Sequence, residues 1–275
     1  MGAPGGSRAS SGWRHDGPVT DGPLVAPGSR GAELAGRLDV VRGRIAAACE
    51  TVGRSPREVT LIAITKTFPA SDIRLLNALG VHDVGENRDQ EAARKAAQCS
   101  DLRPALTWHF VGQLQTNKAA SVVSYADVVH SVDRLRLVRA LGTQARRAGR
   151  IVRGLVQVSL DGDVARGGVV AGQVPEIADA IAAERGLVLG GVMAVAPLAT
   201  SPSAAFSRLA EIAAMVRAAH HEAVMISAGM SGDLEEAIAA DATHVRIGTA
   251  LLGGRPAFVR KCPTHRGSET VMTEG

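Results

Sequence analysis

Residues 61–71, with the sequence LIAITKTFPAS, contain one copy of the pattern that decides the fold. Apolar and β-branched residues, typical of a buried strand, lead up to Lys66, and a helix-like segment begins at Ala70 after a proline. The chain has only four lysines beside 27 arginines, so a lysine at the end of such a strand is a candidate for a chemical role. The segment predicts a strand, a loop that carries an amine, and a helix.

The same unit recurs along the chain. We predict eight strands, over residues 60–66, 81–86, 108–112, 127–132, 154–160, 190–195, 223–227 and 244–251. Helix-like segments lie at residues 32–48, 70–79, 88–97, 134–149, 174–185, 204–219 and 234–240. An open, doubly wound sheet also alternates in this way, but eight full units favour closure. The sequence therefore predicts an α/β fold made of a single (β/α)8 TIM barrel over residues 31–256.

The two ends of the chain differ from this middle part. Fifteen of residues 1–30 are Gly, Pro or Ser, and no hydrophobic period runs through them, so we expect a disordered extension there. Residues 257–275 are expected to form a flexible tail. These ends carry most of the formal charge of +4, which leaves too little on the barrel to favour nucleic acid or anionic lipid as a partner.

The cysteines and the hydropathy of the sequence indicate the cellular compartment that we expect. Cys49, Cys99 and Cys262 are far apart and lack CxxC or Cys/His ligand spacing, so neither a disulfide framework nor a metal site is expected. No apolar run approaches the ~18 residues that span a bilayer. We therefore expect a soluble, cytoplasmic protein that does not bind membranes.

In a parallel barrel the loops that follow the strands carry the chemistry. Lys66 stands at the end of the first predicted strand, where partial burial would lower the pKa of its amine and let the neutral form attack a carbonyl. A lysine that reaches solvent by snorkelling would occupy the same position, and the pattern alone leaves both interpretations open. Residues at the starts of strands, such as Asp83, show no comparable signal.

Two further loops suggest an anion site. Gly248 and Thr249 directly follow the eighth predicted strand, and barrels often hold a phosphate after strands seven and eight. After the seventh, Gly229 predicts a tight turn and Ser231 a helix N-cap. Together with Lys66, these loops indicate one ligand that has both an aldehyde and a phosphate.

Seven motifs in order resemble the pyridoxal phosphate homeostasis protein family. They are ITKTFP around Lys66, DVGEN at 83–87, WHFVGQLQTNK at 108–118, HSVD at 130–133, GVMAVAP at 191–197, SAGMSGDLEEAI at 227–238 and VRIGTALLG at 245–253. The resemblance covers about residues 34–255 and implies a barrel like the N-terminal domain of alanine racemase. It implies pyridoxal 5′-phosphate (PLP) as the cofactor, bound as an aldimine, or Schiff base, of Lys66.

Carried over position by position, the resemblance assigns ten cofactor-binding residues. Lys66 forms the covalent link. Three residues bind the phosphate, namely Ser227, Gly248 and Thr249, helped by amides near Met230 and Ser231. Arg246 lies beside the pyridine nitrogen, and the ring is bordered by Asn87, His109 and Met193. A guanidinium beside that nitrogen disfavours its protonation, so the bound cofactor would be a poor electron sink.

Three functions remain for comparison: a reversible PLP carrier, a PLP-dependent amino-acid racemase, and a class I aldolase that uses a lysine Schiff base. Racemisation needs a second proton donor opposite Lys66, but the single tyrosine, Tyr125, precedes the fourth predicted strand at the other end of the barrel. In an aldolase, Glu86 could transfer the proton. We expect a PLP homeostasis protein rather than an enzyme, with no residue in a catalytic role. PLP-dependent apoenzymes are its candidate partners, and we expect a monomer or a weak dimer.

Overall fold

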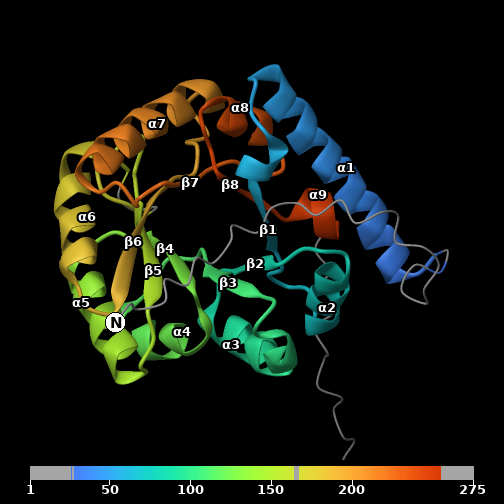
Figure 1. The fold of residues 1–275 in the computed structure, drawn as a ribbon, viewed down its shortest axis with the longest axis horizontal. Coiled ribbons are helices and arrows are strands. Elements are labelled where there is room, and N and C mark those ends of the chain that lie inside the picture. Colours follow the sequence, from blue (N-terminus) through green and yellow to red (C-terminus); the bar gives the residue numbers. More distant parts are fainter. Residues whose placement is uncertain (1–25, 27, 164–166, 255–275) are drawn as a thin grey trace, which may run out of the picture.

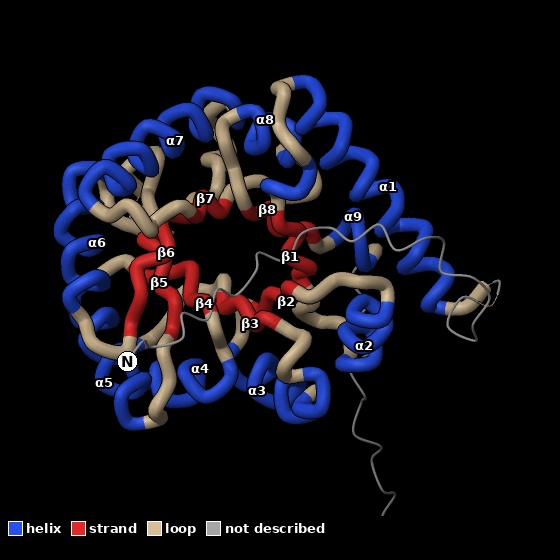
Figure 2. Tube along the Cα trace, viewed as in Figure 1, coloured by secondary structure: helices blue, strands red, loops and turns tan. Residues whose placement is uncertain are grey.

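The computed structural model describes residue 26, residues 28–163 and residues 167–254. Its eight parallel strands pair in sequence order and close into a barrel, which the helices surround (Figures 1 and 2). The strands are β1 (Thr60–Ile64), β2 (Asp83–Glu86), β3 (Thr107–Phe110), β4 (Val128–Val132), β5 (Val152–Gln157), β6 (Leu187–Met193), β7 (Met225–Ser227) and β8 (His244–Ile247). The predicted TIM barrel is confirmed.

Helices follow the strands around the outside of the barrel. They are α1 (Arg30–Thr51), α2 (Ala70–Ala78), α3 (Asp89–Gln98), α4 (Ala119–Tyr125), α5 (Leu135–Arg147), α6 (Val174–Ala183), α7 (Pro202–Ala219), α8 (Leu234–Ala239) and α9 (Thr249–Leu252). Short 3-10 turns lie at Pro56–Glu58, Ser100–Leu102, Thr116–Lys118 and Ala171–Gln173. None of the described helices combines the length and the apolarity needed to cross a lipid bilayer.

Some boundaries differ from the predicted ones. Helix α4 was not predicted, because its sequence AASVVSY is short and rich in serine and valine. The predicted strand 244–251 ends at Ile247, since Gly248 leaves the extended conformation and α9 begins at Thr249. Arg30, the last residue of the predicted extension, is the first residue of α1, and Ser29 caps that helix by accepting a hydrogen bond from Ala32 N–H. Most of that extension and all of the predicted tail at 257–275 lie outside the described residues.

Helix α1 precedes the first strand and completes the ring of helices. It packs against α2, α8 and α9 along the side of the barrel (Figure 1). The residues predicted for its apolar face are all buried, namely Leu34, Leu38, Val41, Ile45 and Ala48. Burial of one leucine or isoleucine side chain contributes about 1.5–3 kcal/mol, so this face holds α1 firmly over β1 and β8.

The interior of the barrel is lined by residues that alternate with the outward, helix-facing ones. Outward residues such as Trp108 and Phe110 belong to the apolar layer between strands and helices. Inside, a small apolar cluster fills one part of the barrel, consisting of Val128, Leu155, Met193 and Met225. Ile62 and Ile64 of β1 also point inward, against Gly85, and the remaining interior includes the polar side chains of a buried hydrogen-bond network.

Candidate functional site

Lys66 lies just beyond β1, at the end of the barrel where the loops that follow the strands meet. Its side chain is half-buried. The next residue, Thr67, has a φ of 71°, which is unusual for a β-branched residue. Such a conformation costs roughly 1–3 kcal/mol and persists only where surrounding contacts impose it. The backbone beside Lys66 is therefore held in place by its neighbours.

Those neighbours include an outer ionic cluster, which we define as Glu86, Glu91 and Lys95. Lys95 Nζ donates to Glu86 Oε1 at 2.7 Å and to Glu91 Oε1 at 2.6 Å. Because Glu86 ends β2 and Lys95 lies on α3, the cluster sits between the sheet and the helices. Burial raises the pKa of Glu86, while Lys95 acts in the opposite direction. Glu86 Oε2 is buried and has no hydrogen-bond partner among the described residues.

The outer ionic cluster makes hydrogen bonds to the backbone on both sides of Lys66. Lys95 Nζ also donates to Thr65 O at 2.8 Å, and Thr65 Oγ1 donates to Glu86 Oε1 at 2.7 Å. On the other side, Thr67 N–H donates to Glu91 Oε1 at 2.6 Å. These bonds explain how Thr67 keeps its strained backbone and how Lys66 keeps its place at the mouth of the barrel.

Arg246 lies on β8, next to β1 in the closed sheet, and is buried. Its guanidinium donates from one terminal nitrogen to Ser227 Oγ at 2.7 Å and from the other to Ala194 O at 2.8 Å. Burial lowers the pKa of Arg246 to about 10. An arginine with two neutral oxygen partners, held inside the barrel, retains donor capacity for a ligand.

The hydroxyl of Ser227, which the resemblance assigned to the phosphate, points into the barrel. Its side chain is completely buried, and its oxygen contacts both Arg246 and His130 Nδ1, the latter at 3.0 Å. These contacts place the Ser227 hydroxyl beside Arg246, and its assignment to the phosphate stays a prediction.

The loops after β7 and β8 meet at the rim. Ala250 N–H donates to Ser231 Oγ at 3.2 Å, which joins the two loops. The tight turn predicted at Gly229 is confirmed by its φ of 85°, and the carbonyl of that residue accepts a hydrogen bond from Arg246 N–H at 2.9 Å. A Cβ atom on Gly248 would lie 3.5 Å from Ile64 Cβ, so the turn approaches the strand that leads to Lys66.

The predicted N-cap at Ser231 is wrong. Helix α8 begins at Leu234, and Asp233 occupies the N-cap position without a side-chain capping bond. Asp233 Oδ1 instead accepts a hydrogen bond from Met230 N–H at 2.6 Å. Ser231 lies outside the helix, where its half-buried hydroxyl faces the β8 turn.

The three residues predicted to border the ring occupy different environments. Asn87 is half-buried just after β2, and Gly112 packs so closely on its backbone that a Cβ atom there would clash with Asn87 O. Met193 ends β6 and is buried in the apolar interior cluster. His109 is also buried, and both of its ring nitrogens make hydrogen bonds, to Asp83 and to His130. Any contact from His109 to a ring would therefore use its carbon atoms.

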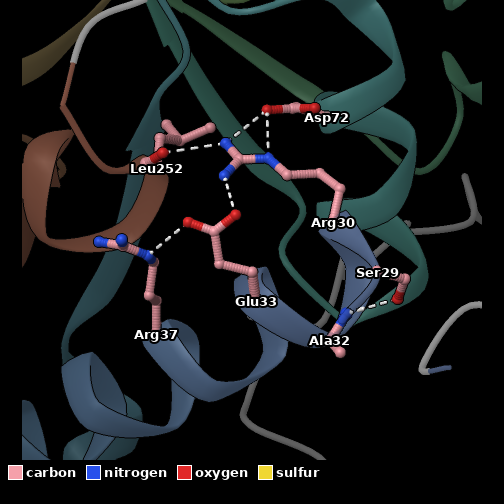
Figure 3. Close-up of polar contacts among 7 residues, drawn as sticks. All are labelled: Ser29, Arg30, Ala32, Glu33, Arg37, Asp72 and Leu252. Atoms are coloured by element: carbon pink, nitrogen blue, oxygen red, sulfur yellow. Dashed lines mark hydrogen bonds and ion pairs between the residues drawn. The ribbon is translucent and has the colours of Figure 1, made fainter. Parts of the chain in front are cut away.

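A second connection at the rim comes from α1, in what we call the Arg30 bridge, formed by Arg30, Asp72 and Leu252. Figure 3 shows the Arg30 guanidinium between the other two, with bonds of 2.7 Å to Asp72 Oδ2 and 2.9 Å to Leu252 O. The bridge ties α2, which follows the Lys66 loop, to α9, which follows Gly248. A pocket beside it is lined by Arg30, Glu33, Arg37, Phe68, Pro69, Asp72, Leu252, Gly253 and Gly254, and does not include Lys66.

Three residues that contact the candidate site were not predicted from the sequence: Asp83, His130 and Lys95. The signal for Asp83 was available, because strand alternation places it on the same inner face as Gly85. Lys95 stands four residues after Glu91 on a helix, which favours an ion pair. No cluster of three or more His, Cys, Asp or Glu suited to a metal ion occurs in the part of the chain that the structure describes.

Comparison with known proteins places the chain in a family. The alanine racemase N-terminal domain family matches residues 38–256. The pyridoxal phosphate homeostasis protein of Mycobacterium bovis is 44% identical over 84% of this chain and 96% of that protein. The protein of the same name from Escherichia coli K12 is 36% identical over 81% of this chain and 97% of its own length.

Solved structures agree with these matches. PipY of Synechococcus elongatus, whose structure has PLP bound, is 34% identical, with a TM-score of 0.68 over 80% of this chain and 100% of PipY. Alanine racemase from Corynebacterium glutamicum is only 15% identical, and its TM-score of 0.60 over 80% of this chain and 60% of that enzyme shows a shared fold. The chain belongs to the family of pyridoxal phosphate homeostasis proteins, within the wider group that has the alanine racemase N-terminal domain fold.

Proposed function

We propose that the chain binds PLP through a covalent link to Lys66 and acts as a reversible carrier in PLP homeostasis, without sustained catalytic turnover. The observation that carries this proposal is the placement of Lys66 just beyond β1 and of Arg246 on the neighbouring strand β8, with a polar network beside each residue. The names of the relatives and the PLP bound to PipY support the choice of ligand.

The residues present fit this cofactor by their chemistry. The amine of Lys66 can attack the aldehyde carbon, which forms a carbon–nitrogen double bond and releases the carbonyl oxygen as water. Backbone turns and hydroxyls gather at the rim on the β7 and β8 side, at Ser231, Gly248 and Thr249, and such groups suit a phosphate. We assign the phosphate to these three residues and to the backbone near Met230, with Ser227, beside Arg246, as a further predicted contact.

When bound, PLP supplies an electron sink whose strength depends on the protonation of its pyridine nitrogen. Arg246 is a donor with no proton-accepting atom, so it disfavours a protonated nitrogen beside it. Its hydrogen-bond partners in the described part of the chain are the neutral oxygens of Ser227 and Ala194. The residue at this position thus favours holding the cofactor over activating it.

The two enzymatic alternatives lack a suitable proton-transfer group. Tyr125 is the only tyrosine, is buried beside Asp89, and burial raises the pKa of its phenol, so it does not serve as a second base opposite Lys66. Glu86, the candidate for an aldolase, faces Lys95 in the helix layer outside the sheet. Neither side chain is directed to the place where a substrate carbon would meet Lys66.

The test is a titration of the purified chain with PLP. We expect a visible absorbance band that is absent in Lys66→Ala and unchanged in Lys118→Ala, whose lysine is half-exposed on the surface. Alanine and serine should racemise no faster than with free PLP. Rapid turnover of either amino acid would overturn the carrier proposal, whereas absence of the band in the wild type would overturn PLP binding itself.

We also propose that the recipients of the cofactor are PLP-dependent apoenzymes and that the chain works in the cytoplasm. Cys49 and Cys99 are both buried free thiols, which supports a reducing compartment. The third cysteine, Cys262, lies outside the described residues.

A further inference from the structure

A continuous series of hydrogen bonds crosses the interior of the barrel. Asp83 on β2 lies 2.9 Å from His109 Nε2 on β3, and His109 Nδ1 lies 2.8 Å from His130 Nε2 on β4. His130 Nδ1 lies 3.0 Å from Ser227 Oγ on β7, which accepts a bond of 2.7 Å from Arg246 on β8. Because β4 and β7 are not neighbours in the sheet, the bond between them passes through the barrel interior. We call these five residues the inner chain.

The positions of the protons in the inner chain are assigned from its two ends. A guanidinium can only donate, so Ser227 Oγ accepts from Arg246, and we assign the serine proton to His130 Nδ1. Burial holds the pKa of His130 well below its usual value, so this ring is neutral and its one proton is on Nε2. His130 then donates to His109 Nδ1, and His109 donates from Nε2 to the carboxylate of Asp83.

In this arrangement each of the four contacts pairs one donor with one acceptor, and all the bonds point from Arg246 toward Asp83. The reverse arrangement would turn the unprotonated Nε2 of a neutral His109 toward the Asp83 carboxylate, so that two acceptors would face each other at 2.9 Å. The nearby ring of His244 does not compete, since burial lowers its pKa to about 3 and its Nδ1 contacts Thr243 Oγ1. The inner chain is therefore polarised, with a cation at one end and an anion at the other.

We propose that Asp83, His109 and His130 are positioning residues that act through Ser227 to hold the Arg246 guanidinium at the place where it meets the cofactor. The inference rests on the proposed function for the role of Arg246, but the direction of the inner chain is a property of the protein alone. Arg246 is buried and its hydrogen bonds within the described residues go to neutral oxygens. A side chain of this length keeps one position only if its partners are themselves fixed, and the inner chain fixes Ser227.

The direct test is nitrogen-15 NMR of the histidine side chains in the protein without cofactor. We expect the proton on Nε2 of both His109 and His130, with Nδ1 of each ring acting as an acceptor. His220→Gln is the matched control, because His220 lies on the exposed end of α7 with Asp179 and its removal should leave both signals unchanged. A proton on Nδ1 of either ring would overturn the proposed direction, whatever the result with PLP.

The positioning role is tested with two substitutions at the far end of the inner chain. Asp83→Ala removes the final acceptor, so we expect a changed tautomer population at His109 and an affinity for PLP about tenfold lower, together with a shift of the visible band. Asp83→Asn keeps an acceptor oxygen and should lie between Asp83→Ala and the wild type, which protects the test against a misfolded alanine variant. Unchanged affinity and an unchanged band in both variants would overturn the positioning role. Failure of the wild type to bind PLP would overturn the proposed function, and with it the role but not the direction of the inner chain.

Discussion

The outer ionic cluster and the inner chain both support the candidate site, but they handle charge in opposite ways. In the outer ionic cluster, Lys95 contacts two carboxylates directly, so opposite charges lie within one hydrogen bond of each other. In the inner chain, two histidines and a serine separate the carboxylate of Asp83 from the guanidinium of Arg246. In the outer ionic cluster the opposite charges are in direct contact, whereas in the inner chain they are joined across the barrel by a series of hydrogen bonds.

The two networks also bind different parts of the candidate site. The outer ionic cluster binds backbone groups of Thr65 and Thr67, and so fixes the loop that carries Lys66. The inner chain binds a side chain, the guanidinium of Arg246. Damage to the first network should therefore appear mainly as lost stability, and damage to the second mainly as altered cofactor binding. The following predictions test that separation, from the largest expected effect to the smallest.

Substitution of Lys95 should cause the largest loss of stability. Lys95→Met leaves Glu86 and Glu91 without their shared cation, and a buried ion pair broken on one side typically costs about 3–5 kcal/mol. The free energy of unfolding in urea measures this effect. Lys118→Met is the control, since Lys118 is half-exposed and its long contact of 3.9 Å with Asp89 should contribute less than about 1 kcal/mol. Equal losses in the two variants would contradict a structural role for the outer ionic cluster.

Acidification should destabilise the protein through the histidines inside the barrel. Burial lowers the pKa values of His130 and His244, so the unfolded state binds more protons and stability falls as pH falls below about 6.5. The slope is about 1.4 kcal/mol per pH unit for each histidine that titrates only when unfolded. Glu86, whose pKa is raised, acts in the opposite direction, because its folded form holds a proton more tightly.

Urea unfolding between pH 6.5 and 5 measures this slope in the wild type and in His244→Gln. We expect a smaller slope in the variant, because one of the two buried neutral rings is gone. His220→Gln, which changes an exposed histidine, should keep the wild-type slope. A slope in His244→Gln as steep as in the wild type would mean that the burial of this ring is not coupled to folding.

Thr67 tests how firmly the outer ionic cluster holds the backbone. Thr67→Gly removes the conformational strain of a φ of 71° and should stabilise the fold by about 1 kcal/mol. The same change frees the Lys66 loop, so PLP should bind more weakly. Thermal unfolding and a PLP titration measure the two effects. If the glycine variant is less stable than the wild type, Thr67 is not strained in the way its backbone angle indicates.

The Arg30 bridge should give the smallest effect on stability. Its arginine is partly exposed, so Arg30→Ala should cost no more than about 1 kcal/mol while loosening the contact between α2 and α9. Arg37→Ala is the matched control, because that residue pairs with Glu33 on its own helix. A weaker affinity for PLP in Arg30→Ala but not in Arg37→Ala would show that the bridge supports the rim, and identical affinities would contradict that role.

The sequence was sufficient for the barrel because each strand and each long helix has its own apolar period. It was not sufficient for α4, where seven residues of mixed propensity become helical only by packing, or for the end of β8, where apolar residues continue into α9. Lys66 was a candidate because it stands out locally as a rare lysine, whereas Arg246 was assigned by the resemblance to the family.

The networks behind these two residues could not be predicted in the same way. The bond between His130 and Ser227 joins residues 97 positions apart, and it exists only because the barrel closes. The local pattern around His130 fits an ordinary buried histidine, and that around Asp83 an ordinary strand start. The N-cap at Ser231 was predicted wrongly for a related reason. A serine before an acidic helical segment is typical of an N-cap, but in the folded barrel its hydroxyl accepts a hydrogen bond from Ala250 N–H instead.

Reduction of the PLP-treated protein with borohydride, followed by tryptic digestion and mass spectrometry, tests the central claim most directly. Trypsin does not cleave after a modified lysine, so a link at Lys66 predicts one uncleaved peptide, residues 58–74, that carries the added mass of the reduced cofactor. Added mass at Lys95, Lys118 or Lys261 instead, or no added mass on any peptide, would contradict the assignment of Lys66 as the residue that holds the cofactor.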